Sequence, residues 1–148
     1  MPLKNSTSNS PQTFDKIQKV LTTHGADKIM FDYAKDRSGR LEAISFSLEI
    51  DGQLRGFKLP AKVENVVAIL YGGKDRWGNK KTPTQAQRDQ AYRTAWANIR
   101  DWIDAQMALI DTEQAKLEEV FLPYMLASDG RTLYEHMESK HFALPSGN

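Results

Sequence analysis

Cysteine is absent from the 148-residue chain, so the protein forms no disulfide and has no thiolate for catalysis or metal binding. Long apolar runs are absent too, and no stretch approaches the roughly 20 residues that span a bilayer. The first ten residues lack the apolar segment of a secretion signal. We therefore expect a cytoplasmic protein without a membrane partner, in one domain large enough to bury a core.

Motifs for catalysis and cofactor binding are also missing. Gly72-Gly73-Lys74 lacks the spacing and the Ser or Thr of a phosphate-binding loop. His136 and His141 are five residues apart and so do not share a helix face, as a pair of metal ligands on one helix would. We expect that the protein is not an enzyme and holds neither a metal nor a cofactor.

The first half of the chain has the pattern of helix, three strands, helix. Apolar residues at helical spacing predict a helix over Thr13–His24, closed by Gly25. Strand-like runs follow at Lys28–Lys35, Leu41–Ile50 and residues 53–60, and a second helix is predicted at Val63–Tyr71.

A hairpin is the clearest local signal in the sequence. Asp51-Gly52 is typical of a two-residue turn in which both residues have positive φ. That turn aligns two runs so that apolar residues share a face. The predicted pairs are Ile50 with Gln53, Leu48 with Arg55, Phe46 with Phe57, and Ile44 with Leu59.

A long helical stretch, Thr82 to Tyr124, dominates the second half. Thr82 and Gln85 predict a capping box around Pro83. A continuous helix over residues 83–122 would be about 60 Å long, too long for a small domain. We expect a break or kink near Leu122, before Pro123, with residues 112–115 as the alternative break.

These elements define an α+β fold with one sheet face covered by helices. We expect a disordered tail at residues 1–12, a single domain at 13–142 and a frayed tail at 143–148. Within the domain, residues 13–73 supply the sheet and two short helices, 82–126 the long helical arm, and 131–140 a short final helix.

The apolar stripe of the long helix has two interpretations. It is either the core seam against the rest of the chain or a partner or dimer interface, since large aromatic side chains suit both. The residues assigned to the interface under the second interpretation are Trp96, Trp102, Ile103, Gln106 and Ile110.

Charge is segregated along the chain although the net charge is only +1. Residues 74–100 carry seven basic and two acidic side chains, whereas residues 101–138 carry two basic and nine acidic ones. Basic residues interleaved with an aromatic ring are typical of nucleic-acid binding, although a solvated loop is the alternative. The candidate nucleic-acid-binding residues are Lys74, Arg76, Trp77, Lys80, Lys81, Arg88 and Arg93.

The long helix also carries a family resemblance. The strings Ala91-Tyr92-Arg93-Thr94-Ala95-Trp96, Asp101-Trp102, Ala105 to Ile110 and Leu117 to Tyr124 resemble a family of small uncharacterised phage and prophage proteins. The resemblance extends over most of the chain and implies no site residue. It implies a virus-encoded accessory protein in the cytoplasm of an infected or lysogenic host cell.

Two functions are consistent with these features. The first is a non-enzymatic phage-type accessory protein that binds nucleic acid, single-stranded DNA above all, in DNA replication or recombination. The alternative is a protein-interaction module or self-assembling subunit, such as an inhibitor of a host or defence protein. Under the alternative the partners are a host protein or a second copy of the chain bound through the long helix.

Overall fold

The computed structural model describes residues 10–146, and the expected α+β fold is confirmed. Of the predicted tails, residues 1–9 and 147–148 lie outside the described part, and Ser10 already begins the first helix. The elements, in order, are α2 Ser10–Thr23, β1 Lys28–Tyr33, β2 Leu41–Ile50, β3 Gln53–Pro60, α3 Val63–Tyr71, α4 Gln85–Asp111, α5 Leu117–Phe121, the 3-10 turn η1 Leu122–Tyr124 and α6 Leu133–Ser139.

The sheet is antiparallel with strand order β1-β2-β3. All four predicted hairpin pairs are confirmed, from Ile50 with Gln53 to Ile44 with Leu59. Asp51 and Gly52 have φ of 51° and 80°, as the two-residue turn requires. The first strand ends at Tyr33, two residues earlier than predicted, because the Ala34 N–H already donates to the Arg40 carbonyl and closes the next loop.

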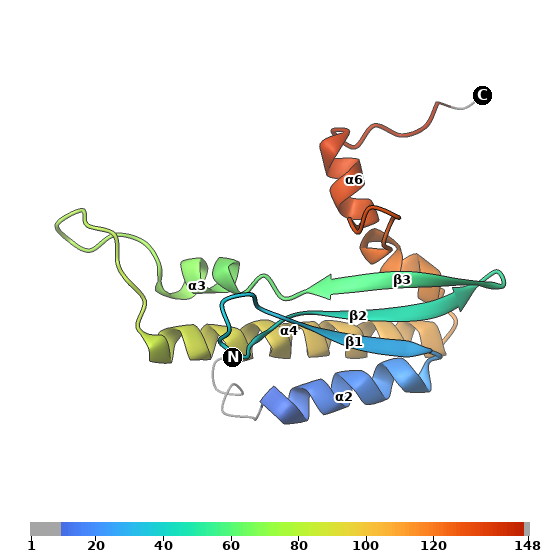
Figure 1. The fold of residues 1–148 in the computed structure, drawn as a ribbon, viewed down its shortest axis with the longest axis horizontal. Coiled ribbons are helices and arrows are strands. Elements are labelled where there is room, and N and C mark those ends of the chain that lie inside the picture. The colour runs from blue at the N-terminus through green and yellow to red at the C-terminus, as the bar shows by residue number, and fades with distance from the viewer. Residues whose placement is uncertain (1–9, 147–148) are drawn as a thin grey trace.

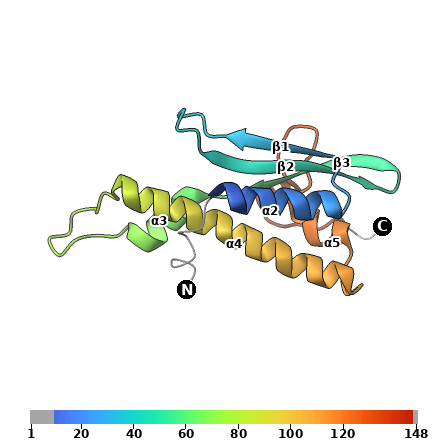
Figure 2. The ribbon, with the colours of Figure 1, turned by 90° about the horizontal axis from the view of Figure 1, so that it is seen from below.

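Helices α2 and α4 lie side by side against one face of the sheet, and the opposite face is largely open (Figures 1 and 2). The buried core between them joins alternate residues of β2 and β3 to one stripe from each helix. Its fully buried large side chains are Ile17, Leu21, Ile44, Leu48, Phe57, Trp96, Ile103 and Phe121.

The start of α4 differs from the prediction by two residues. Thr84, not Thr82, is the N-cap, and its hydroxyl accepts from the Gln87 N–H at 3.1 Å. The Gln87 side chain accepts from the Thr84 N–H at 3.0 Å, which completes the capping box. Pro83 therefore precedes the cap instead of occupying the first turn.

The long helix breaks at the alternative position, where residues 112–116 separate α4 from α5. It also breaks near Leu122 as predicted, because α5 ends at Phe121 and the 3-10 turn η1, which contains Pro123, begins at Leu122. Glu113 takes a positive φ of 61°, and the Gln114 N–H donates back to the Leu109 carbonyl at 2.8 Å. The chain then reverses, and α5 brings Phe121 against Phe46 and Trp102 at ring separations of 5.2 and 5.7 Å. Core packing of Phe121 thus accounts for the break at residues 112–116.

The C-terminal segment covers the outer edge of β3. The Leu126 N–H donates to the Gly56 carbonyl at 2.7 Å, and Met125 bridges to Phe57. A tight turn at 127–130 leads into α6, which Thr132 and Glu135 cap reciprocally. Across residues 10–146, no helix combines the length and apolar character needed to cross a membrane.

Candidate nucleic-acid interface

The loop between α3 and α4 projects away from the sheet at one end of the molecule (Figure 1). Its residues 74–81, which we call the basic finger, are closed by backbone hydrogen bonds. Asp75 N–H donates to the Asn79 carbonyl at 2.8 Å, and Lys81 N–H donates to the Gly73 carbonyl at 2.9 Å. Lys74 and Lys80 pair as an antiparallel bridge. The basic finger therefore has a defined backbone although it does not pack on the core.

Asp75 holds the tip of the basic finger together. Its Oδ1 accepts from the Trp77 N–H at 2.8 Å and from the Asn79 N–H at 3.0 Å. This is the side-chain-to-backbone bonding by which Asp stabilises tight turns. The only acidic side chain of the basic finger therefore accepts hydrogen bonds from the backbone of the finger.

Trp77 is the exposed aromatic residue of the finger, with 72% of its surface open to solvent. The guanidinium carbon of Arg76 lies 4.5 Å from the centroid of its ring, which is a cation–π contact. Lys74, Lys80 and Lys81 are also exposed. Within residues 10–146, none of the finger's four cations forms an ion pair.

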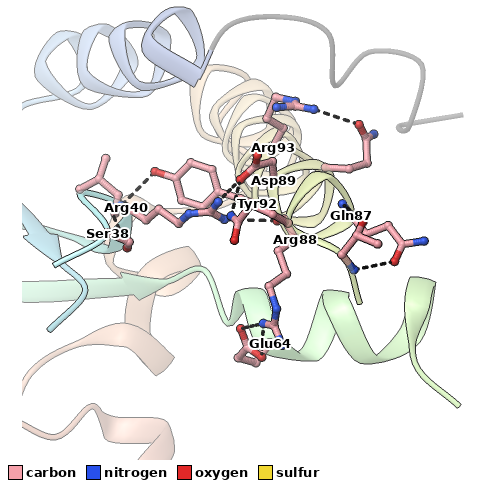
Figure 3. Close-up of polar contacts among 12 residues, drawn as sticks. Ser38, Arg40, Glu64, Gln87, Arg88, Asp89, Tyr92 and Arg93 are labelled. Carbon is pink, nitrogen blue, oxygen red and sulfur yellow. Dashed lines mark hydrogen bonds and ion pairs between the residues drawn. The ribbon is translucent and has the colours of Figure 1, made fainter. Parts of the chain in front are cut away.

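Arg88 and Arg93 do not join the basic finger. Figure 3 shows them pointing to different sides of α4. Arg88 donates from one nitrogen to both carboxylate oxygens of Glu64 at 3.0 Å, and Arg93 donates to the Gln90 side chain at 3.2 Å. The seven predicted residues therefore divide into a compact group of five and two side chains held elsewhere.

A polar network that the sequence analysis missed lies beside the start of α4 (Figure 3). Arg40 bonds to the carboxylate of Asp89 and, at 3.3 Å, to the Arg88 carbonyl. Its guanidinium also lies over the Tyr92 ring, whose hydroxyl accepts from the Leu41 N–H at 2.9 Å. Burial raises the pKa of Tyr92 above its usual range. Because Arg40 and Asp89 are 49 residues apart, no local motif marks the pair.

This network borders a cleft of about 620 Å³, which lies between the 34–40 loop with the start of β2, the start of α3, and α4. Three cationic and three anionic side chains line it, so the cleft has no net charge with which to select a charged ligand. The charged lining residues are Asp36, Arg40, Glu42, Lys62, Glu64 and Arg88.

Two of the five residues of the predicted partner interface on α4 belong to the buried core, which corrects the interpretation for those two. Trp96 and Ile103 are 0% and 1% exposed, and the Trp96 indole N–H donates to the Leu41 carbonyl at 3.3 Å. Trp102 packs edge-on against Phe121 and Tyr124. Gln106 and Ile110 are partly exposed. Trp96 and Ile103 are thus unavailable to a partner in this fold.

Several acidic side chains of residues 101–138 are paired with basic side chains of the same chain. Asp129 accepts from the Arg131 N–H, from His136 and from the Arg131 side chain, which together hold the pKa of that carboxyl well below its usual range. Three further ion pairs are Asp104–Lys16 at 2.9 Å, Asp111–His24 at 2.8 Å and Asp101–Arg100 at 3.1 Å. The fold therefore presents fewer unpaired acidic side chains in this segment than the sequence alone indicates.

No group of three or more His, Asp or Glu side chains within residues 10–146 is placed to hold a metal ion. Comparison of the chain with protein-family models, with curated proteins and with solved structures finds no match. The choice of binding surface therefore depends on the geometry and charge of this chain.

Proposed function

We propose that this protein binds single-stranded nucleic acid, DNA above all, through the basic finger. The observation that carries the proposal is Trp77, 72% exposed beside Arg76 and framed by Lys74, Lys80 and Lys81. Cations attract the phosphate backbone, and an exposed aromatic ring offers a face on which an unpaired base stacks. An exposed tryptophan at the tip of a basic loop fits this combination.

The hydrogen bonds of Asp75 support the same function. A loop that is already ordered loses less conformational entropy on binding than a flexible loop does. Because Asp75 bonds to the N–H groups of Trp77 and Asn79, the ring and the cations are held together before a ligand arrives. The finger is thus preorganised.

The preference for single strands follows from the mode of contact. In a duplex the base faces are stacked on one another, so Trp77 has a base to contact only where a strand is unpaired. The lysines would attract duplex phosphates as well, but without the stacking contribution. We infer that the protein acts as a non-enzymatic accessory factor in DNA replication or recombination, in the phage setting that the resemblance of the long helix implies.

Fluorescence anisotropy of labelled single- and double-stranded oligonucleotides at several salt concentrations tests this function. With four cations in the finger, a plot of the logarithm of the association constant for single strands against the logarithm of the salt concentration should have a slope no steeper than about −2.8. The Lys80→Glu/Lys81→Glu variant should bind far more weakly. Lys19→Glu/Lys140→Glu, at exposed positions outside the finger, is the matched control.

The alternative function is a protein-interaction module that inhibits a host or defence protein. Of its two motivating features, the tryptophans of α4 pack against the core, and three of the acidic side chains pair with cations of the same chain. If neither oligonucleotide binds at low salt, pull-down from host lysate with the intact chain becomes the relevant test.

A further inference from the structure

One edge of the sheet is covered by another segment of the chain, and the other edge is not. Residues 125–126 cover the outer edge of β3. At the other edge, no backbone hydrogen bond joins residues 29–33 to a described residue outside the sheet. Natural proteins usually protect such an edge, because its unpaired N–H and C=O groups are a template for another strand. We propose that β1 pairs with β1 of a second copy, which joins two sheets into one of six strands.

The side chains of β1 favour one antiparallel register. Lys28, Met30 and Asp32 lie on the open face, opposite Ser47, Ser45 and Ala43 of β2. A twofold axis at Met30 places Lys28 opposite Asp32 of the second copy, and by symmetry forms this charge pair twice. Opposite charges directly across two strands stabilise their pairing.

The hydrophobic pattern agrees with the charges in this register. Met30, 64% exposed in the single chain, faces its own counterpart across the axis. Ile29 lies opposite Phe31 of the second copy on the core face, where Phe46 and Ile44 are their neighbours within the sheet. The apolar face and the open face of one sheet therefore continue into those of the other.

Neighbouring registers lose these matches. A shift by one residue places Ile29 opposite Asp32 and joins the apolar face of one copy to the open face of the other. A shift by two places Met30 opposite Asp32 or Lys28 and leaves both charge pairs unformed. Of the registers compared, only the one centred on Met30 forms both Lys28–Asp32 pairs and keeps the apolar face and the open face continuous between the two copies.

Cysteine cross-linking tests the register because the chain has no native cysteine. Met30→Cys places two thiols on directly opposite residues, within the range that a disulfide spans. Leu54→Cys is the matched control, since Leu54 is 57% exposed and lies opposite Glu49 on the same open face, but at β3. Under mild oxidation we expect a covalent dimer from Met30→Cys only. Equal cross-linking of both variants, or of neither, would overturn the proposal.

Charge reversal tests the Lys28–Asp32 pairs in solution. Asp32→Lys replaces two attractive pairs with two repulsive ones, and the dimer dissociation constant should rise about tenfold or more. The exchange variant Lys28→Asp/Asp32→Lys restores opposite charges and should recover the dimer. Both variants lose the hydrogen bond from the Ser45 hydroxyl to Asp32, so this loss cannot explain a difference between their dimer dissociation constants.

Sedimentation equilibrium of the full chain over about a hundredfold range of concentration gives the readout. A monomer throughout for the unmodified chain overturns the proposal, as does an exchange variant as weak as Asp32→Lys. Neither result bears on nucleic-acid binding by the basic finger.

Discussion

His24 Nε2 lies 2.8 Å from Asp111 Oδ1, so an ion pair joins the end of α2 to the end of α4. The other ring nitrogen, Nδ1, lies 2.9 Å from the Val20 carbonyl. Burial alone would lower the pKa of His24, but the hydrogen bonds to Val20 and Asp111 and the charge of Asp111 outweigh it, and the pKa is raised above 6.5. Both ring nitrogens face acceptors, which favours the doubly protonated ring.

Stability should therefore decrease with rising pH through the titration of His24. The contribution of this group is fully present below its unfolded pKa, about 6.5, and is lost as pH rises through the higher folded value. We expect urea unfolding between pH 5.5 and 8 to show a flatter pH dependence for His24→Gln than for the unmodified chain. The exposed His141→Gln is the control, and an unchanged slope in His24→Gln would contradict the assignment.

Replacement of Trp96 should be the most costly of the three tryptophan substitutions. Trp96→Phe leaves the Leu41 carbonyl without its indole donor and opens a cavity under the sheet, which should cost about 2–4 kcal/mol of unfolding free energy. Trp102→Phe should cost less, since Trp102 is partly exposed, and Trp77→Phe close to nothing. Urea denaturation ranks the three, and a larger loss for Trp102 would refute this account of the core.

Removal of the α4 cap distinguishes Thr84 from Thr82. Thr84→Ala removes the acceptor for the Gln87 N–H and should lower the unfolding free energy by about 1 kcal/mol. Thr82→Ala, two residues outside the box, should change it by less than about 0.5 kcal/mol. Equal losses in chemical denaturation would mean that the box does not stabilise the helix.

Asp75→Ala should loosen the basic finger without destabilising the core. Hydrogen exchange at Trp77 and Asn79 is expected to accelerate, because both N–H groups lose their acceptor, while the melting temperature stays unchanged. Asp36→Ala removes a similar contact to Ser38 in another loop and is the control. Unaltered exchange in the finger after Asp75→Ala would show that other contacts order it.

Local sequence patterns predicted the parts of the fold that depend on interactions between residues close together in the chain. The Asp51-Gly52 turn and strand alternation were sufficient for the hairpin register. The break near Leu122 was predictable from Pro123. The break at residues 112–116 was harder to predict, because this segment contains neither Gly nor Pro, and Glu113 adopts a positive φ that a non-glycine residue rarely takes. The core contacts of Phe121 override helix propensity there, and they depend on the tertiary structure.

The candidate site was likewise predictable only where nearby residues in the sequence define it. Charge and sequence position placed Trp77 among basic residues, and in the structure its side chain is exposed. They did not indicate that Glu64, 24 residues away, engages Arg88. Helical periodicity also could not decide whether Trp96 faces the core or a partner, since both give the same spacing.

Binding of a labelled single-stranded oligonucleotide by Trp77→Ala and Trp77→Phe tests the central claim most directly. Loss of base stacking in Trp77→Ala should cost about 1–3 kcal/mol, or roughly 5- to 150-fold in affinity, while Trp77→Phe keeps an aromatic face and should retain most of the binding. The charges are the same in all three proteins, so electrostatic attraction alone predicts no difference. Equal affinity of Trp77→Ala and the unmodified chain would contradict the proposed role of the basic finger.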